Sequence, residues 1–426
     1  MKFFTHSLGC KVNSYEVAAI VKTLKEEGHQ ESSLEEADLI VLNTCSVTGQ
    51  ADQKSRQHIR RFRRANDHAC LLIMGCYSEA TAEDCLSFGA DIVLGTSSRN
   101  QAVPSWHKFL ETGEKINLVN KNIRHEKYEE LGSIINFDMT RAYLKVQDGC
   151  DNFCSYCIIP TVRGNSRSRN KDSVIAEAKE LVEKGYQEII LTGIHIGHYG
   201  ADLDPKCSIS DLIKDILDAV PTLKRLRISS IEETEIDNKA FLSLLKNYPQ
   251  ITSHLHIPLQ SGSSSVLKRM RRKYDTDSFL LLLDKIRAIR PDIAITTDII
   301  VGFPEETEEE FKETLEFCKK AKFAEIHVFP FSPRKGTWAA ANKNQVDPQT
   351  KKDRVHRLLE LSKVGRKAYE EKFYGKTLEV LFEDFDEDKH IAYGHTSNYL
   401  KVGIPSKRSL HGEMLEVEYS KETAAD

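Results

Sequence analysis

Three cysteines lie close together near the middle of the sequence, at Cys150, Cys154 and Cys157. Thiolates on so short a loop can converge on one metal centre. A structural zinc site normally closes with four protein ligands and a ferredoxin cluster uses four cysteines, but no fourth Cys or His stands nearby in the sequence. Three ligands on a cubane iron–sulfur cluster leave one iron open to a small molecule. The spacing favours such a cluster over the alternative of zinc-bound or simply buried thiols.

Three more cysteines, Cys10, Cys45 and Cys76, each stand where a predicted strand ends. Ligands of open α/β sheets bind in the crevice outside the carboxyl ends of the strands. These thiols could therefore hold a second cluster, although they are far apart in sequence. The alternative is that they are small buried hydrophobic side chains, as most lone cysteines are. No function is assigned to the remaining cysteines, which are Cys70, Cys85, Cys207 and Cys318.

The elements around the second set alternate between strand and helix patterns over residues 1–120. Short apolar runs at 38–44 and 69–75 predict strands buried on both faces. Asn13 and Glu16 resemble a capping box at the start of a helix that Gly28 would stop. Such alternation predicts an α/β fold with a doubly wound, mostly parallel sheet.

The close-set cysteines belong to a longer stretch, from about 140 to 365, that repeats a β/α unit six times. Its predicted strands are 142–147, 188–192, 225–229, 254–258, 293–300 and 326–331, and its predicted helices include 174–184, 211–219, 279–290 and 308–320. Six units favour a partial (β/α)6 TIM-like barrel, whose active site would gather at the carboxyl ends of the strands.

The last segment has four short strand-like runs, at 378–383, 391–395, 400–404 and 414–419, which predict a small antiparallel β-barrel. The predicted domains are 1–118, 136–366 and 369–426, with residues 120–138 as a polar linker. The chain has 426 residues, a short polar N-terminus and no apolar run long enough to cross a bilayer, so we expect a cytoplasmic protein without a membrane partner. We also expect a monomer. The net charge of −4 argues against a general nucleic-acid-binding surface but leaves room for local basic patches. In the cytoplasm ten cysteines are not expected to form disulfides.

The Cys-x3-Cys-x2-Cys spacing, with Tyr156 before the last cysteine, resembles the signature of the radical SAM superfamily. The resemblance implies that the open iron binds S-adenosylmethionine (SAM) and that one electron cleaves SAM to a 5′-deoxyadenosyl radical. It also implies that Cys150, Cys154 and Cys157 are the catalytic cysteines and that Gly193, Glu232 and Gln260 contact SAM.

Nearly the whole chain is similar to the methylthiotransferase family, through residues 7–13 (SLGCKVN), 158–169 (IIPTVRGNSRSR) and 256–263 (HIPLQSGS). The resemblance implies two [4Fe-4S] clusters, an auxiliary one on the cysteines at 10, 45 and 76 and a radical SAM one on those at 150, 154 and 157, and a C-terminal TRAM-like barrel. The radical would abstract hydrogen from a carbon, the auxiliary cluster would supply sulfur and a further SAM the methyl group. Glu305 and Glu233 depart from the family pattern, which often has Gly and Pro there.

The family resemblance offers three substrates. The segments around Lys11 and around Tyr399 most resemble the type that modifies carbon 2 of N6-threonylcarbamoyladenosine at position 37 of tRNA; the isopentenyl type usually has Gln-Met-Asn after the first cysteine. Methylthiolation of isopentenyladenosine-37 or of a ribosomal-protein aspartate remains an alternative, as does a non-catalytic iron–sulfur module that binds RNA or senses redox state. The implied partners are the tRNA anticodon stem-loop, SAM and a reducing electron donor.

Two basic runs are candidates for contact with RNA phosphates, although such runs are more often solvated faces. They comprise Lys54, Arg56, Arg60, Arg61, Arg63 and Arg64, and Lys268, Arg269, Arg271, Arg272 and Lys273. Arg163, Arg167 and Arg169 follow the central cysteines and could instead serve carboxylates of SAM or substrate.

Overall fold

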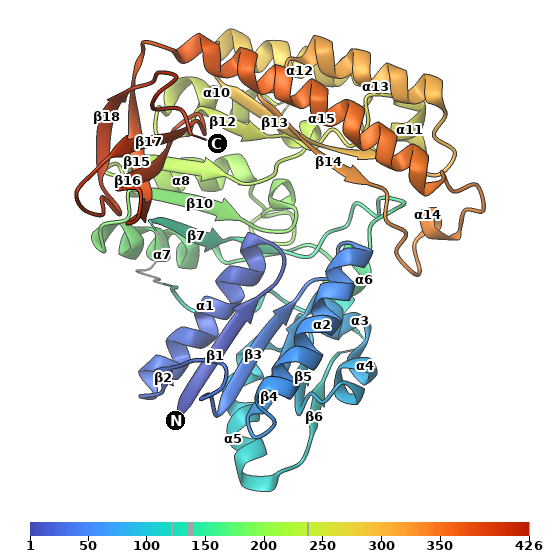
Figure 1. Ribbon diagram of the computed structural model, residues 1–426, viewed down its shortest axis with the longest axis vertical. Coiled ribbons are helices and arrows are strands. Elements are labelled where there is room, and N and C mark those ends of the chain that lie inside the picture. Colours follow the sequence, from blue (N-terminus) through green and yellow to red (C-terminus); the bar gives the residue numbers. More distant parts are fainter. Residues whose placement is uncertain (121, 135–139, 237, 426) are drawn as a thin grey trace.

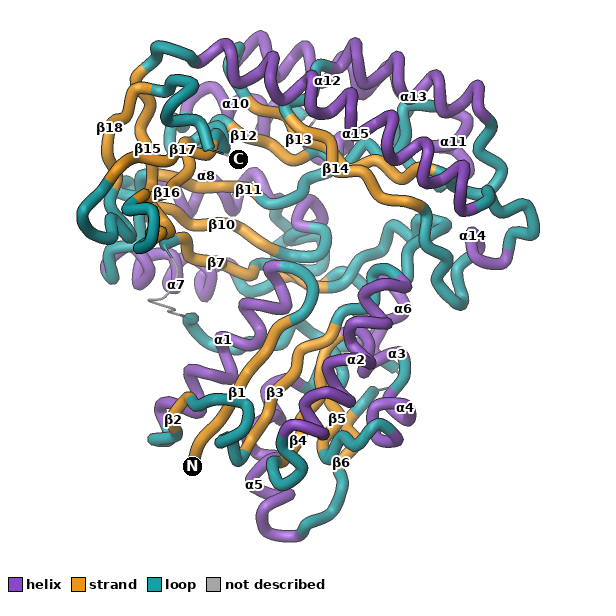
Figure 2. Tube along the Cα trace, in the orientation of Figure 1, coloured by secondary structure: helices purple, strands orange, loops and turns teal. Residues whose placement is uncertain are grey.

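The computed structural model describes residues 1–120, 122–134, 140–236 and 238–425. The first part of the chain forms a six-stranded parallel sheet in the order β2-β1-β3-β4-β5-β6 (Figures 1 and 2). Its strands are β1 (Lys2–Ser7), β2 (Gln30–Glu31), β3 (Leu39–Thr44), β4 (Cys70–Gly75), β5 (Ile92–Leu94) and β6 (Ile116–Leu118). Every residue of β3 and β4 is buried, as the predicted apolar runs require.

Helices cover both faces of this sheet, which confirms the doubly wound fold. α1 (Lys11–Glu26) and α5 (Ala102–Thr112) pack on one face, where Ile20, Leu24 and Trp106 are buried against alternate strand residues. α2 (Gly49–Ala65) and α4 (Ala82–Ser87) pack on the other face with Ile59 and Phe62. The short α3 (Cys76–Ala80) follows β4, and the turn η1 (Arg99–Gln101) precedes α5.

The predicted capping box of α1 is wrong. Cys10 is the N-cap with extended backbone, and no side chain caps the helix. Asn13 and Glu16 lie inside the helix and are buried, because their polar groups are held by the sheet edge and by other parts of the chain rather than by the first turn. Gly28 follows the helix with φ of 82°, as the sequence predicted.

The central part is an open six-stranded barrel. The strands β7 (Arg141–Lys145), β10 (Glu188–Thr192) and β11 (Arg225–Ile228) pair in parallel, as do β12 (His254–His256), β13 (Ala294–Val301) and β14 (Glu325–Pro330). Parallel bridges from Leu226 to Ile251 and from Ser230 to His256 join the two groups. Among the described residues β7 and β14 do not pair, so the barrel is open on that side and the predicted partial (β/α)6 barrel is confirmed.

Helices surround this barrel. The long ones are α7 (Lys171–Glu183), α8 (Ile209–Ala219), α10 (Lys239–Asn247), α12 (Thr276–Ile289), α13 (Glu308–Ala321) and α15 (Pro348–Glu370). The short elements are β8 (Gln147–Asp148), α6 (Ile159–Val162), β9 (Arg167–Ser168), η3 (Ile196–His198), α9 (Glu233–Ile236), α11 (Ser264–Arg269) and α14 (Trp338–Ala341).

Polar side chains line the inside of the barrel. Leu226 and Ile228 of β11 belong to the apolar core beneath the helices, so the alternating residues Arg225 and Arg227 face the interior. The same alternation places Glu188 of β10 on the interior face. An interior of this kind suits a polar ligand better than an apolar one.

The C-terminal part is a four-stranded antiparallel sheet in the order β17-β16-β15-β18. Its strands are β15 (Thr377–Asp386), β16 (Ile391–Thr396), β17 (Lys401–Pro405) and β18 (Met414–Glu418), and the turn η4 (Glu371–Phe373) precedes them. It is half of the predicted barrel, since β17 and β18 do not pair with each other among the described residues. Val380 and Phe382 share a core with Ala294 and Ala324 of the central part, beside the first residues of the barrel strands (Figure 1).

The described part of the predicted linker is packed rather than free. It contains η2 (Ile123–His125), Tyr128 donates a hydrogen bond to the Lys145 carbonyl (3.0 Å), and Glu129 pairs with Arg99 (2.9 Å). Residues 121 and 135–139 of this stretch lie outside the described residues. Within the described part of the chain, no helix is both long and apolar enough to span a membrane.

Candidate active site with two sets of cysteines

The central cysteines lie on a loop after β8 that is tied to the barrel at both ends. The Cys150 amide donates to the Gly164 carbonyl (3.0 Å), and the Ser155 amide donates to the Met270 carbonyl (3.1 Å). Gly149 has φ of 72°, and a Cβ there would lie 1.9 Å from the Asn165 carbonyl oxygen. Only glycine allows the backbone at this position to lie so close to Asn165. Glycine is therefore needed to place the next residue, Cys150, where it is.

Charged groups surround these thiols. An Nη1–H of Arg272 donates to the Cys154 sulfur (3.2 Å), and Nη2 of Arg272 lies 2.9 Å from Glu232. Asn152 also donates to Glu232 (3.0 Å). Burial, together with the nearby charge of Cys154, raises the pKa of Cys157 to about 12. Binding of iron in place of the proton would therefore relieve an unfavourable ionisation.

His195 joins the same group from the end of β10. Burial opposes its protonation, but the neighbouring Cys150 and the carboxylates of Glu235 and Glu232 raise the pKa of His195 to about 10. Its Nε2 lies 3.6 Å from Glu235 and 3.8 Å from Glu232. The imidazolium is therefore held between the cysteine loop and two carboxylates.

The residues expected to contact SAM lie at the carboxyl ends of three neighbouring strands. Glu232 is in direct contact with the cysteine loop through Asn152. Gly193 precedes two amides, of Ile194 and His195, that donate to Gln147 Oε1 at 3.0 and 2.7 Å. Gln260 has φ of 71° and is half-buried after β12. All three positions lie on the rim that carries the central cysteines.

Cys10, Cys45 and Cys76 meet at the carboxyl edge of the first sheet. They follow β1, β3 and β4, which are neighbours in the sheet. A Cβ at Gly9 would lie 3.1 Å from the Cys45 sulfur, so the loop of Cys10 rests against Cys45. Burial, with smaller contributions from the charges of Cys45 and Cys10, raises the pKa of Cys76 to about 12, although the Arg163 guanidinium opposes this. Three thiols far apart in sequence thus share one small region.

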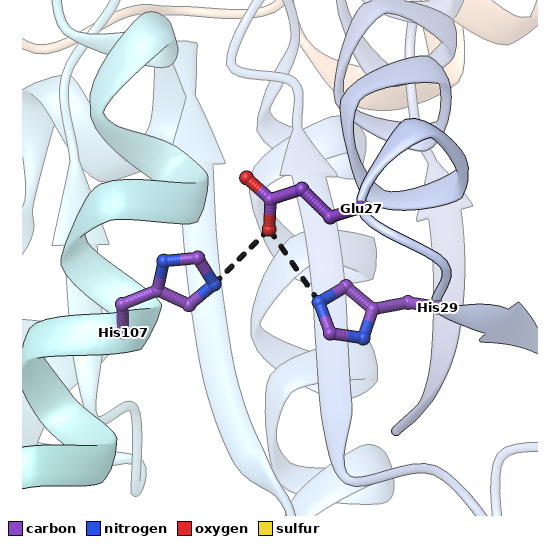
Figure 3. Close-up of side chains that lie close together, drawn as sticks. All are labelled: Glu27, His29 and His107. Atoms are coloured by element: carbon purple, nitrogen blue, oxygen red, sulfur yellow. Dashed lines mark ion pairs between the residues drawn. The ribbon is translucent and has the colours of Figure 1, made fainter.

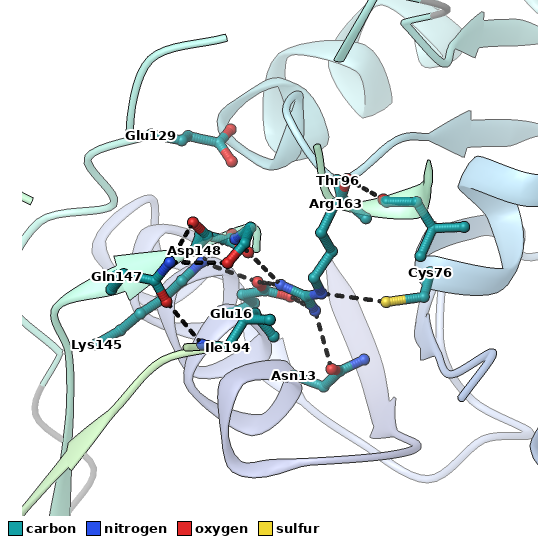
Figure 4. Close-up of polar contacts among 12 residues, drawn as sticks. Asn13, Glu16, Cys76, Thr96, Glu129, Lys145, Gln147, Asp148, Arg163 and Ile194 are labelled. Carbon is teal, nitrogen blue, oxygen red and sulfur yellow. Dashed lines mark hydrogen bonds and ion pairs between the residues drawn. The ribbon is translucent and has the colours of Figure 1, made fainter. Parts of the chain in front are cut away.

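Arg163 connects the two sets (Figure 4). Its Nε–H donates to the Cys76 sulfur (3.1 Å), and its Nη1 donates to Glu16 and to Asp148, both at 3.0 Å. Asp148 comes two residues before Cys150 in the sequence. Arg163, Glu16 and Asp148 are almost fully buried, at 0%, 0% and 1% exposure.

The rest of this buried network balances its charge. Lys145 contacts Glu16 (3.0 Å) and Asp148 (2.7 Å), and Arg99 lies 2.9 Å from Glu16. The neighbouring Arg163 guanidinium helps to hold the pKa of Glu16 well below its usual range, despite the burial that opposes this. Buried charges are tolerated only when paired and hydrogen-bonded, so this network fixes the first sheet on the barrel.

A second contact fastens the first sheet to the other side of the barrel opening. Arg334, in the loop after β14, donates to Asp52 (2.5 Å) and Ser46 (2.9 Å) beside Cys45. The carboxyl edge of the first sheet therefore spans the open side between β7 and β14 (Figure 1). Both sets of cysteines consequently border the barrel interior.

Some interpretations of the basic residues are wrong. Arg163, Arg167 and Arg169 are 0–3% exposed and have protein partners, Arg169 pairing with Glu177, so they do not present free cations to a ligand. The second basic run is divided: Arg269 pairs with Glu310 (2.7 Å) and Arg272 serves the cysteine loop. The sequence analysis assigned Arg163 to carboxylates and Arg272 to phosphates. It missed that each donates an N–H to a cysteine sulfur, because only the fold brings them there.

Another group of ligand-type side chains lies away from this site. Glu27 lies 3.1 Å from His107 and 3.5 Å from His29, between the end of α1 and α5 (Figure 3). Glu27 is at the opposite end of α1 from Cys10, and the three side chains close the turn after that helix as ion pairs. We assign them no ligand.

The donor sets fit iron–sulfur clusters. Tetrahedral zinc with Zn–S bonds of ~2.3 Å would draw its sulfurs to within about 4 Å of one another. Among the described residues, neither cysteine set has its three sulfurs within 4.8 Å of one another, which suits a larger cluster. In each set an arginine N–H donates to one sulfur, and hydrogen bonds of this kind stabilise and tune sulfur-ligated clusters.

Comparisons with known proteins agree with this site. Residues 144–318 match the radical SAM superfamily, and residues 2–95 match a family described as uncharacterized protein family UPF0004. A solved structure of the radical SAM methyltransferase TsrM from Kitasatospora setae superposes with a TM-score of 0.58 at 13% identity, over 78% of this chain and 73% of that one. At that identity the likeness concerns the fold alone. The fold and the match to the radical SAM superfamily together show that this chain is a radical SAM enzyme.

Relatives in sequence show which family of radical SAM enzymes this chain belongs to. The threonylcarbamoyladenosine tRNA methylthiotransferase MtaB of Bacillus subtilis (strain 168) is 43% identical over 98% of this chain and 93% of its own length. MtaB of Thermotoga maritima is 36% identical over 93% of this chain and 89% of its own. A tRNA-2-methylthio-N(6)-dimethylallyladenosine synthase of Oceanobacillus iheyensis is 34% identical over 99% of this chain and 82% of its own. The chain belongs to the methylthiotransferase family of radical SAM enzymes, and its cofactors are SAM and [4Fe-4S] clusters.

Proposed function

We propose that this enzyme methylthiolates carbon 2 of N6-threonylcarbamoyladenosine at position 37 of tRNA. The observation that carries the proposal is the placement of two cysteine sets on facing edges of one interior, joined through Arg163 and Asp148. The similarity to MtaB enzymes over nearly the full chain supports the threonylcarbamoyl substrate over the dimethylallyl one. The tRNA substrate would place the reaction in the cytoplasm.

In this proposal Cys150, Cys154 and Cys157 hold the radical SAM cluster, and Cys10, Cys45 and Cys76 hold the auxiliary cluster. Gly193, Glu232 and Gln260 contact SAM. Their position on the rim that carries the central cysteines supports this assignment. We further propose domains at 1–118, 136–366 and 369–426, a monomeric enzyme and an external reducing electron donor.

The bound cofactors would supply the radical that removes the hydrogen of carbon 2, and the sulfur and methyl group that replace it. The chain's own residues would position the cofactors and shield the radical from water. Arg272 and Arg163 each direct an N–H at a cysteine sulfur, which disperses negative charge on it. Glu232, held by Asn152 and Arg272, would offer a fixed carboxylate to a positively charged group of SAM. The first sheet, fastened on both sides of the opening, would keep water from the radical.

Analysis of tRNA nucleosides by mass spectrometry tests the function. A strain that lacks this protein should lose the methylthio form of threonylcarbamoyladenosine and keep the unmodified parent nucleoside. Expression of the intact chain should restore it, and the C150A/C154A/C157A variant should not. Persistence of the methylthio nucleoside in the deletion strain would refute the proposal, and loss of a methylthio isopentenyl nucleoside instead would favour the alternative substrate.

The iron and sulfide content of purified protein tests the ligand assignment. We expect the C150A/C154A/C157A variant to retain about one of two clusters, because the auxiliary set lies on a separate sheet. A C10A/C45A/C76A variant should also retain about one and should still cleave SAM to 5′-deoxyadenosine under reduction. Loss of all iron from both variants would contradict two independent sites.

A further inference from the structure

Lys11 and Tyr399 are far apart in the sequence but lie within electrostatic range of each other. Lys11 opens α1, directly after Cys10, and Tyr399 lies in the turn between β16 and β17. The guanidinium carbon of Arg227 lies 4.6 Å from the centre of the Tyr399 ring, and His254 stacks on the same ring at 4.9 Å. Arg141 approaches its hydroxyl at 3.4 Å. The segments that most resemble the threonylcarbamoyladenosine type thus converge on one place.

The Lys11 ammonium has no ion pair or hydrogen bond with any of the described residues. The side chain is half-buried, and burial lowers the pKa of Lys11, as do the positive charges of Arg141 and Arg227, whereas Tyr399 and Glu188 raise it. A half-buried cation without a counter-ion costs free energy unless a ligand supplies one. Lys11 is therefore available to an anion.

Arg227 adds to this positive region from β11. It is 1% exposed, and Glu188 takes its Nε–H (2.6 Å). Its Nη1 nevertheless has no hydrogen-bond partner among the described residues, although it is buried. Arg227 therefore does not use its full hydrogen-bonding capacity, and its positive charge adds to that of Lys11.

The charges around this region do not cancel. Arg141 is paired with Glu383 (2.6 Å), and Arg225 with Glu379 (3.2 Å). Glu188 lies between Arg227 and Arg225, at 2.6 and 3.7 Å. Of the described side chains named here, each carboxylate has a cationic partner, and Lys11 is the cation left over. His254 also keeps its Nδ1 unpaired, with Nε2 on Thr296 (3.0 Å).

We infer that Lys11 and Arg227 form a subsite that binds the carboxylate of the threonylcarbamoyl group. This inference rests on the proposed function and names how its substrate is selected. The group carries a carboxylate and a hydroxyl, whereas a dimethylallyl group is apolar. Lys11 pairs with the carboxylate, and the positive charge of Arg227 strengthens that attraction. Because Lys11 follows Cys10, a carboxylate held there keeps the adenine next to the auxiliary cysteines.

A pocket built for a carboxylate should reject a neutral substituent, because buried polar groups would then stay unpaired. The first experiment uses the intact holoenzyme and anticodon stem-loop RNAs that carry either the threonylcarbamoyl acid or its carboxamide. We expect kcat/KM for the acid to exceed that for the carboxamide by at least about tenfold, mainly through KM. Equal values would overturn the subsite. Failure to methylthiolate either RNA would instead count against the proposed function.

The second experiment compares Lys11→Gln, Lys11→Arg and Lys25→Gln. Lys25 is an exposed residue at the other end of α1 and serves as the matched control. We expect K11Q to lose the preference for the acid while retaining activity on the carboxamide, and K11R and K25Q to keep the preference. An unchanged preference in K11Q, or an equal loss on both RNAs with a full iron content, would overturn the inference. If K11Q loses iron, the acid-to-carboxamide ratio of the wild-type enzyme decides the question alone.

Discussion

At the scale of single residues, two arginines give the cysteine sets a common design. Arg272 donates to the Cys154 sulfur and Arg163 to the Cys76 sulfur, at 3.2 and 3.1 Å. Both guanidinium groups are held from behind by carboxylates, Glu232 in one set and Glu16 with Asp148 in the other. A fixed N–H donor offers less reorganisation than water would, so it stabilises charge on sulfur throughout a redox cycle.

Replacing Arg163 tests this design. Removing one member of a buried charge network leaves the other charges uncompensated, so Arg163→Met should lower stability by about 3–5 kcal/mol and lower the iron content of the auxiliary set. Arg163→Lys should keep more stability but should shift the electronic spectrum of the auxiliary cluster, because the N–H donor to sulfur is lost.

Urea unfolding, iron analysis and absorption spectra give the three readouts. The control is Lys363→Met, which removes an exposed pair with Glu360 on α15 and should cost under about 1 kcal/mol. Full iron content and normal stability in Arg163→Met would show that the network does not hold the auxiliary site.

At the scale of elements, the backbone around each cysteine is as important as the thiol. Gly75 ends β4 with φ of 105°, and a Cβ there would lie 2.3 Å from Asn43 Oδ1 and 2.4 Å from the Thr44 carbonyl oxygen. Glycine is required at this position both by the conformation and by the contact. The strand can then turn directly into α3 with Cys76 at its first position.

Gly75→Ala should therefore displace Cys76 and reduce the auxiliary iron, with little effect on SAM cleavage at the other set. The matched control is Gly28→Ala, in the same part of the chain. Gly28 has φ of 82°, but an added methyl group would meet nothing within 4 Å, so only the conformational cost of about 1 kcal/mol is expected. Iron analysis of both variants separates the contact from the conformation. Equal iron in both would contradict the argument.

The contacts of Glu305 show how a residue other than glycine is accommodated at one position that departs from the family pattern. It adopts φ of 66°, the left-handed conformation that glycine enters without strain. Its carboxylate accepts hydrogen bonds from Asn342 (3.2 Å) and Asn344 (3.3 Å), which offset the cost.

At the scale of the whole molecule, exposed basic residues of α2 are candidates for phosphate contact. Arg60, Arg61 and Arg64 are exposed, whereas Arg63 is tied to Asp91 at 2.5 Å. Each phosphate contact releases counter-ions, so it adds to the salt dependence of binding. α2 lies on the same part of the molecule as the auxiliary cysteines (Figure 1).

The Arg60/Arg61/Arg64→Gln triple variant should bind tRNA more weakly and should lower the slope of log affinity against log salt by about two to three. Fluorescence anisotropy at several salt concentrations measures it. The control removes the same charge from exposed lysines of α13 and α15, in Lys319/Lys320/Lys363→Gln, and should leave the slope unchanged. Equal slopes in both variants would place the tRNA elsewhere.

The sequence by itself determined much of this protein. Strand periods and glycines after strands were sufficient for the fold class, because these are local patterns with local causes. The spacing of Cys150, Cys154 and Cys157 predicted one loop that carries all three thiols. The position of Cys10, Cys45 and Cys76 at strand ends predicted their meeting, since parallel strands share one carboxyl edge. The capping box predicted from Asn13 and Glu16 was wrong, because both side chains are buried against other parts of the chain instead of capping the helix.

Only the tertiary structure decided how these parts act together. Arg163 is one of several arginines in the sequence, and Arg272 stands in a basic run, yet folding places each on a different sulfur. Lys11, Arg227 and Tyr399 come from three separate segments and have no shared pattern. Buried charges must find partners wherever the fold brings them, and that pairing depends on contacts across the whole chain rather than on neighbours in sequence. The sequence therefore determines which chemistry is present, and the tertiary contacts decide where the charges that direct it lie.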